Sequence, residues 1–157
     1  MFQSVRDASE SVKLNDVDGS ALTSFYESDH ATKWVGNSRD ASQPQDGITH
    51  ILNCAHDLDQ RVGWAHKVNH FHVGMVDGAN HPALYAAALN ILNAICADPG
   101  AKVLVHCHEG RSRSVYVVAL YLVSKQIKLD MDQALEYIRQ CGRDVSVAGG
   151  HFDSFRL

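Results

Sequence analysis

"VLVHCHEGRSRSVYVVALYLVS", residues 103–124, places a polar segment between two apolar runs. The first run, residues 101–106, has the apolar composition of a buried parallel strand. The second run, residues 115–124, is almost wholly apolar and predicts a helix that is buried on most sides. A strand, a tight turn and a helix in this order form an anion site, because the N–H groups of the turn and the helix N-terminus attract negative charge.

The rest of the chain alternates between strand and helix patterns. Strands are predicted at residues 32–36, 48–55 and 66–75, and further helices at residues 84–97 and from about residue 130. Residues 37–47 predict a polar connection or a short helix. This alternation predicts an α/β fold with a central, mainly parallel, twisted sheet that is flanked by helices. We expect one domain over residues 1–157, with residues 1–30 as a poorly defined segment.

Composition limits the classes of partner and compartment. The chain has 157 residues and a net charge of −4 without a basic stripe, so we expect no nucleic-acid partner. The longest apolar run, residues 115–123, is too short for a membrane span of about 20 residues. The N-terminus has no signal-peptide pattern. Four cysteines without a CxxC pair indicate reduced thiols, so we expect a cytoplasmic protein, with the nucleus as a further location.

The residue types in the polar segment predict nucleophilic chemistry. Cys107 ends the predicted strand, and the following helix N-terminus favours its thiolate, the nucleophilic form. Arg113, six residues later, is placed to bind a tetrahedral oxyanion with two parallel hydrogen bonds. Ser114 is placed to donate to the sulfur when it becomes a leaving group. The N–H groups of residues 108–113 are expected to bind the other oxygens of the anion.

The same residues form the pattern His-Cys-x-x-Gly-x-x-Arg-Ser at His106, Cys107, Gly110, Arg113 and Ser114. This pattern resembles the signature of the cysteine-based protein tyrosine phosphatase superfamily. The short chain and "SRS" at residues 112–114 resemble its small atypical dual-specificity branch, and the resemblance extends over about residues 32–156 through "GITHILNCA", "LYLVSK", "LDMDQALEYIR" and "GGHFDSF". It implies hydrolysis of phosphotyrosine and phosphoserine or phosphothreonine on proteins through a phosphocysteine, without a metal or other cofactor.

The resemblance also implies roles for individual residues. It implies that the general acid is Asp77, which lies 30 residues before Cys107, since Asp57 and Asp59 come too early in the chain. His106 is expected to support the loop. The expected phosphate-binding residues are His108, Glu109, Gly110, Arg111, Ser112 and Arg113.

Three positions depart from the family pattern. Glu109 stands where the family often has alanine, and we expect its side chain to turn outward toward Arg111. Tyr116 replaces a smaller residue, and "SVAGGHF" lacks the frequent Pro-Asn before its aromatic residue. Some relatives have a cysteine at the position of Cys54 that forms a disulfide with the nucleophile. Cys54 is therefore either a redox partner of the nucleophile or a core residue.

Other functions remain as alternatives. A phosphoinositide phosphatase is the closest, because His108 and Arg111 add basic groups to the loop, but Glu109 cancels charge there. The acidic net charge disfavours an RNA triphosphatase, and the position of the motif disfavours a low-molecular-weight tyrosine phosphatase. Relatives that only bind phosphoproteins usually lack the cysteine. His70 and His72 lack a third ligand at a defined spacing, so we expect no metal site. The oligomeric state stays open.

Overall fold

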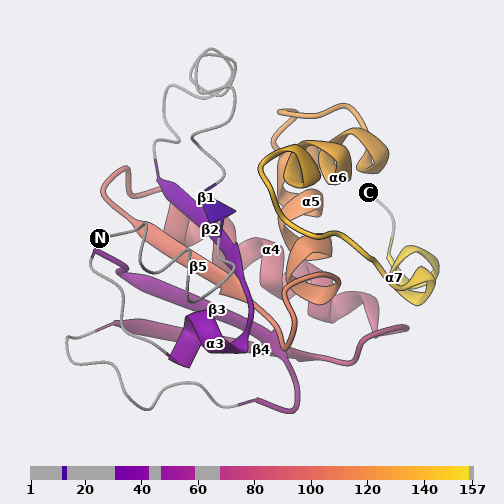
Figure 1. The fold of residues 1–157 in the computed structure, drawn as a ribbon, viewed down its shortest axis with the longest axis horizontal. Coiled ribbons are helices and arrows are strands. Elements are labelled where there is room, and N and C mark those ends of the chain that lie inside the picture. Colours follow the sequence, from indigo (N-terminus) through magenta and orange to yellow (C-terminus); the bar gives the residue numbers. More distant parts are fainter. Residues whose placement is uncertain (1–11, 14–30, 43–46, 59–67, 156–157) are drawn as a thin grey trace.

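The computed structural model describes residues 12–13, 31–42, 47–58 and 68–155. These residues form a five-stranded sheet in the order β1-β2-β5-β3-β4 (Figure 1). The strands are β1 (Val12–Lys13), β2 (Thr32–Gly36), β3 (His50–Ala55), β4 (Asn69–Met75) and β5 (Lys102–His106). Only β1 runs antiparallel to its neighbour, while the pairs β2–β5, β5–β3 and β3–β4 are parallel. The predicted α/β fold with a mainly parallel sheet is thereby confirmed.

Five helices are described around the sheet. They are α3 (Ser38–Ser42), α4 (Pro82–Cys96), α5 (Arg113–Ser124), α6 (Met131–Gln140) and α7 (Gly149–Ser154). The helix α3 lies within the predicted polar connection, and α7 was not foreseen as a helix. Among the described helices, none has both the length and the apolar character that a membrane crossing requires.

The sheet has a larger and a smaller hydrophobic layer, one on each face. Along β5, Val103 and Val105 belong to the large core that also contains residues of α4, α5 and α6, whereas Leu104 belongs to a small cluster with Ala41 of α3. This division follows from the alternation of side chains along a strand. In Figure 1, α4, α5 and α6 accordingly lie on the opposite side of the sheet from α3.

The parallel strands bring three loops to one edge of the sheet. His106 at the end of β5 lies opposite Asn53 of β3, and Ala55 of β3 lies opposite Met75 of β4. The chain segments that follow these three strands therefore leave the sheet side by side. Open α/β sheets characteristically bind ligands at this carboxyl edge.

Candidate active site

The loop between β5 and α5 is held by hydrogen bonds to its outer side. The carbonyl groups of residues 108–111 all accept from other segments. For residues 108, 109, 110 and 111 in turn, the donors are Ser38 N at 2.9 Å, Arg143 Nη2 at 3.0 Å, Arg143 Nε at 2.7 Å and Ser146 N at 2.9 Å. A trans peptide unit points its N–H opposite to its C=O, so the N–H groups of residues 109–112 turn toward the inside of the loop. The loop therefore presents a row of donors to an anion.

Arg143 is the central support of this loop and was missed in the sequence. Its side chain is only 2% exposed, and its guanidinium spans the carbonyls of Glu109 and Gly110. It lies more than thirty residues after the loop, beyond α6, so no local pattern links it to the motif. The fork of an arginine suits two adjacent carbonyl acceptors better than a single ammonium group does.

Cys107 lies at the loop's inner side, within a cavity of about 140 Å³. The cavity is lined by Asp77, Cys107, His108, Glu109, Arg111, Ser112, Arg113 and Ser146. Cys107 Sγ is 3.2 Å from Ser114 Oγ. Ser112 gives no side-chain hydrogen bond to the first turn of α5, so the positive end of this helix stays available to a thiolate or a bound anion.

Arg113 is held in place by the segments that follow β3 and β4. Its Nη1 donates to Met75 O at 2.9 Å and lies 3.3 Å from Asp57 Oδ1. The pKa of Asp57 is lowered, first by the residue's own backbone N–H, which donates to the carboxylate, and then by the nearby Arg113. Asp57, which was considered only as a rival acid, is therefore a partner of the guanidinium. Asp59 lies outside the described residues.

Asp77 reaches the cavity from the loop after β4. Its Oδ1 accepts a hydrogen bond of 2.5 Å from Ser112 Oγ. Asn80 braces this loop, because its Oδ1 accepts from Val76 N at 2.8 Å and its Nδ2 donates to Val76 O at 2.9 Å. The structure thus brings a carboxyl group to the cavity that contains the Cys107 thiol, at the position to which the family resemblance pointed.

Glu109 and Arg111 pair with each other at the rim of the cavity. Arg111 Nη2 lies 2.5 Å from Glu109 Oε1, and Arg111 Nη1 lies 3.5 Å from Asp144 Oδ2. The outward turn of Glu109 expected from the sequence is what the structure shows. Two carboxylates therefore flank the guanidinium of Arg111, and they offset its positive charge.

His106 is buried beneath the loop. Its Nδ1 lies 3.2 Å from Cys107 O, and its Nε2 has no hydrogen bond within the described part of the chain. Burial lowers the pKa of His106 to about 4, so the ring is neutral at neutral pH. A neutral ring that contacts the cysteine carbonyl suits a supporting role better than a proton-transfer role.

Cys54 lies near the end of β3, beside the point where Cys107 follows β5. Asn53 is opposite His106 in the parallel pair β3–β5, so the next residues, Cys54 and Cys107, leave the pair together. Cys54 is fully buried, and its pKa is raised by burial and by the nearby Cys107, with Arg113 acting in the opposite direction. The structure holds both thiols free. This placement is compatible with both a core role and a redox role.

The histidines of β4 have structural contacts. His72 Nε2 lies 2.6 Å from Ala55 O, which ties β4 to the end of β3. Within the described residues, no three His, Cys, Asp or Glu side chains are grouped closely enough to hold a metal ion.

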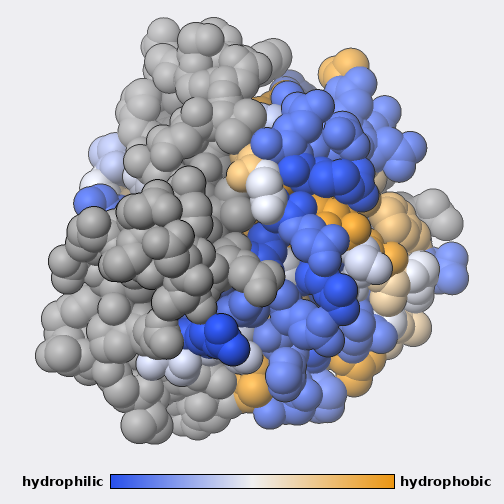
Figure 2. All heavy atoms as spheres, viewed as in Figure 1, coloured by the Kyte–Doolittle hydropathy of each residue, from blue (hydrophilic) through white to orange (hydrophobic). Residues whose placement is uncertain are grey.

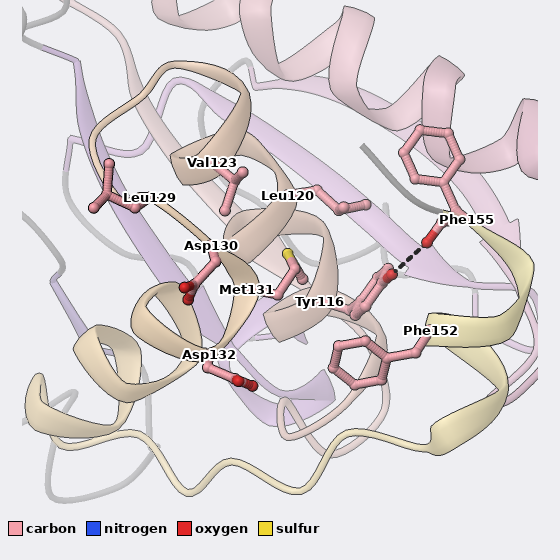
Figure 3. A pocket seen from close by; sticks show the side chains of 9 residues that line it. All are labelled: Tyr116, Leu120, Val123, Leu129, Asp130, Met131, Asp132, Phe152 and Phe155. Carbon is pink, nitrogen blue, oxygen red and sulfur yellow. Dashed lines mark hydrogen bonds between the residues drawn. The ribbon is translucent and has the colours of Figure 1, made fainter.

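A larger groove of about 480 Å³ lies between α5, α6 and α7 (Figure 3). Its walls are mostly apolar and are formed by Tyr116, Leu120, Val123, Leu129, Asp130, Met131, Asp132, Phe152 and Phe155. Hydrophobic residues also show between α6 and α7 in the space-filling view, within an otherwise mostly hydrophilic described surface (Figure 2). The groove walls include neither a nucleophile nor a basic residue, so the small polar cavity around Cys107 is the candidate active site.

A known protein family matches most of this chain. Residues 33–155 match the family model described as "Dual specificity phosphatase, catalytic domain". The chain is 33% identical over 101 residues to dual specificity protein phosphatase PHS1 of Arabidopsis thaliana. The matched segment covers 62% of this chain but only 11% of that protein. The chain thus spans a small part of this curated relative.

Solved structures show the same fold. The crystal structure of human DUSP28 has a TM-score of 0.63 at 23% identity, covering 78% of this chain and 84% of that chain. The crystal structure of PTPMT1 in complex with PI(5)P has a TM-score of 0.61 at 20% identity, covering 80% and 88% of the two chains. At these identities, the likeness concerns the fold alone.

Proposed function

Since the chain belongs to the dual specificity phosphatase catalytic domain family, we propose that it hydrolyses phosphate monoesters on proteins through a phosphocysteine at Cys107. The observation that carries this proposal is the cavity itself. It combines the thiol, the buried guanidinium of Arg113, a row of inward N–H groups and the carboxyl group of Asp77. Together these supply a nucleophile, charge stabilisation and a proton donor.

In the first step, the Cys107 thiolate attacks phosphorus in line with the ester bond. The S–P bond forms as the P–O bond breaks, and Asp77 gives its proton to the leaving oxygen. Arg113 and the N–H groups of residues 109–112 bind the three remaining oxygens. These groups are fixed before the reaction by Met75 O, Arg143 and the other outer contacts, so little reorganisation is needed in the transition state.

In the second step, water replaces the sulfur. The Asp77 carboxylate takes a proton from the water as it attacks phosphorus, the S–P bond breaks, and the electron pair returns to sulfur. Ser114 Oγ, 3.2 Å from Cys107 Sγ, donates a hydrogen bond to the departing thiolate. Inorganic phosphate then leaves, and the free thiolate is restored.

The cavity favours a phosphoprotein over a larger small-molecule substrate. Its volume of about 140 Å³ is below the ~300 Å³ at the lower end for drug-sized ligands, so it accommodates the phosphoryl group and little else. Because the cavity holds only the phosphoryl group, the rest of the substrate side chain stays outside it, and the cavity does not select by the length of that side chain. This supports activity on both phosphotyrosine and phosphoserine or phosphothreonine. A second hollow of about 390 Å³ adjoins it and shares His108, Glu109 and Arg111, and it offers room for neighbouring residues of a peptide.

A phosphoinositide substrate is the second candidate, favoured by the fold likeness to PTPMT1, whose crystal structure contains PI(5)P. The pairing of Arg111 with Glu109 and Asp144 argues against it, because these carboxylates offset the positive charge that would attract an anionic headgroup. We further propose that the protein acts in the cytoplasm, and also in the nucleus, where reducing conditions keep Cys107 a free thiol.

Parallel assays on phosphopeptides and phosphoinositides test the proposal. We expect phosphate release from phosphotyrosine and phosphothreonine peptides, with much slower release from phosphoinositides in vesicles, and no release by Cys107→Ser. Faster turnover of phosphoinositides would reassign the substrate class. Equal turnover by Cys107→Ser would remove the enzymatic proposal, and a wild type that binds phosphopeptides without releasing phosphate would indicate a binding module.

A further inference from the structure

His151 is a buried histidine that the phosphatase motif does not include. It lies in α7, its side chain is fully buried, and its Nε2 lies 3.4 Å from Asp77 Oδ1. On the other side of the ring, His151 Nδ1 lies 2.6 Å from the hydroxyl oxygen of Tyr85 in α4. The ring therefore bridges a helix of the core and the carboxyl group at the cavity.

The hydrogen bonds around Tyr85 define which nitrogen of His151 has the proton. Asn80 Nδ2 donates to the Tyr85 oxygen at 3.0 Å, so the tyrosine proton is free to point to another acceptor. His151 Nδ1 lies 2.6 Å from the Tyr85 oxygen and is a closer acceptor than Gly78 O at 3.5 Å. Tyr85 thus donates to Nδ1, and in the neutral ring the proton is on Nε2, which faces Asp77.

Burial is the main reason why the ring stays neutral. Burial lowers the pKa of His151, and Arg113 acts in the same direction, while contact with Asp77 opposes both. The other titratable groups against the ring are Tyr85 and Tyr116, and the Tyr116 ring stacks on His151 with centroids 5.1 Å apart. His151 is therefore a neutral N–H donor at neutral pH rather than a charged partner.

This donor lacks a hydrogen bond in the structure. Within the described part of the chain, His151 Nε2 makes no hydrogen bond, although it is completely buried. A buried polar group without a partner is unfavourable. A small movement of Asp77 from its contact with Ser112 toward His151 would satisfy the ring, so His151 Nε2 is a second donor within reach of the carboxyl group.

The helix α7 is also fixed directly to the loop that contains Asp77. A Cβ atom on Gly150 would lie 2.6 Å from Ala79 N and 2.7 Å from Gly78 C, so the two backbones are in tight contact. Ser154 Oγ accepts from Asn80 N at 2.9 Å and donates to Gly150 O at 2.7 Å. The helix that contains His151 and the loop that contains Asp77 are therefore packed directly against each other.

We propose that His151 is a positioning residue for proton transfer, which together with Tyr85 holds the Asp77 carboxyl group in its working orientation. This inference rests on the proposed role of Asp77 as the acid, and it assigns a function to α7 that the loop motif does not contain. Loss of the donor would leave the carboxyl group free to turn away from the leaving oxygen.

The leaving group of the substrate provides the test. Phenyl phosphate needs a proton on its departing oxygen far more than p-nitrophenyl phosphate, whose phenolate is already stable. His151→Phe keeps the stacked ring and removes both nitrogens. We expect it to lower kcat for phenyl phosphate by about 10-fold, as for the loss of one ordinary hydrogen bond, and to change kcat for p-nitrophenyl phosphate little. His151→Gln, which restores an N–H donor, is expected to recover part of the loss, and Tyr85→Phe to show a weaker form of it.

Tyr116→Phe is the matched control. Tyr116 donates from its hydroxyl group to Phe155 O at 2.9 Å (Figure 3), so this variant loosens the end of α7 and keeps the ring on His151. It is expected to affect both substrates alike. Urea denaturation of each variant checks that the fold is intact.

The outcomes separate this inference from the proposed function. If Asp77→Asn slows phenyl phosphate selectively but His151→Phe behaves as wild type, the positioning role is wrong and the proposed function stands. An equal loss on both substrates in His151→Phe, matched by Tyr116→Phe, would show a purely structural role. If wild type lacks Cys107-dependent turnover, the proposed function itself fails.

Discussion

Gly110 is the position where a single added methyl group tests the shape of the phosphate loop most severely. Its φ of 70° lies in the left-handed region, and it packs directly against the backbone at the end of β2. A Cβ atom at Gly110 would lie 2.5 Å from Gly36 O, 2.7 Å from Gly36 C and 2.8 Å from Arg143 Nη2. Gly110→Ala therefore combines an unfavourable backbone conformation with a collision that backbone atoms cannot avoid without moving.

The expected loss follows from these two effects. A non-glycine residue in the left-handed conformation costs about 1–2 kcal/mol, and the collision forces the loop away from Gly36 and from the guanidinium of Arg143. Since that guanidinium holds the carbonyls of Glu109 and Gly110, the inward N–H groups lose their alignment. Removing one such donor typically costs about 10²–10³ in kcat, and several donors are displaced here, so we expect a loss of about 100-fold or more.

Gly142→Ala is the matched control for this prediction. Gly142 also has a positive φ, 104°, but a Cβ atom there would meet nothing within 4 Å. It should lose about 1–2 kcal/mol of unfolding free energy from backbone strain alone and retain kcat close to wild type. The measurements are kcat and KM on an aryl phosphate and the urea midpoint of each variant. A Gly110→Ala enzyme with unimpaired kcat would refute the reasoning that this contact shapes the loop.

Three further predictions concern the residues around the thiol. Because burial lowers the pKa of His106 from 6.5 to about 4, the unfolded chain takes up this proton first as the pH falls. The contribution of His106 to the unfolding free energy is therefore greatest above pH 6.5 and is lost toward pH 4. Urea denaturation between these pH values should show a smaller decrease in unfolding free energy for His106→Gln than for wild type. Ser114→Ala should lower kcat and KM together, because it slows release of the thiolate but not its attack, and an unchanged kcat would contradict this. Under hydrogen peroxide, the Cys107 thiolate should form a sulfenic acid with release of hydroxide, and attack by the Cys54 thiol on that sulfur should then expel water and form a disulfide. Mass spectrometry should detect that crosslink, and sulfinic or sulfonic Cys107 without it would exclude the redox role.

The sequence was sufficient for the fold class and for the centre of the candidate site because both depend on local patterns. The strand before Cys107 and the helix from Arg113 are encoded by two apolar runs that flank one polar turn. Asp77 was reached through the spacing in the family resemblance rather than through any property of its own surroundings. Asp77 is one of several aspartates that follow strands, so its position after a strand does not by itself single it out.

The supports of the site could not be predicted, because each depends on packing between distant segments. Arg143 reaches the loop from beyond α6, and Asp57 meets Arg113 only because β3 and β5 are neighbours in the sheet. His151 sits in "GGHFDSF", where the absence of the family's Pro-Asn was visible, but nothing local shows that its ring faces Asp77. Such contacts arise from the three-dimensional arrangement and have no characteristic spacing in the chain.

The most direct test of the central claim is to trap the covalent intermediate. Ser114→Ala is mixed with p-nitrophenyl phosphate, quenched in acid within milliseconds, digested and analysed by mass spectrometry. The account predicts a peptide in which Cys107 has gained one phosphoryl group, together with a burst of nitrophenolate close to the enzyme concentration. Turnover without any phosphorylated Cys107 peptide, or phosphate on another residue, would contradict it.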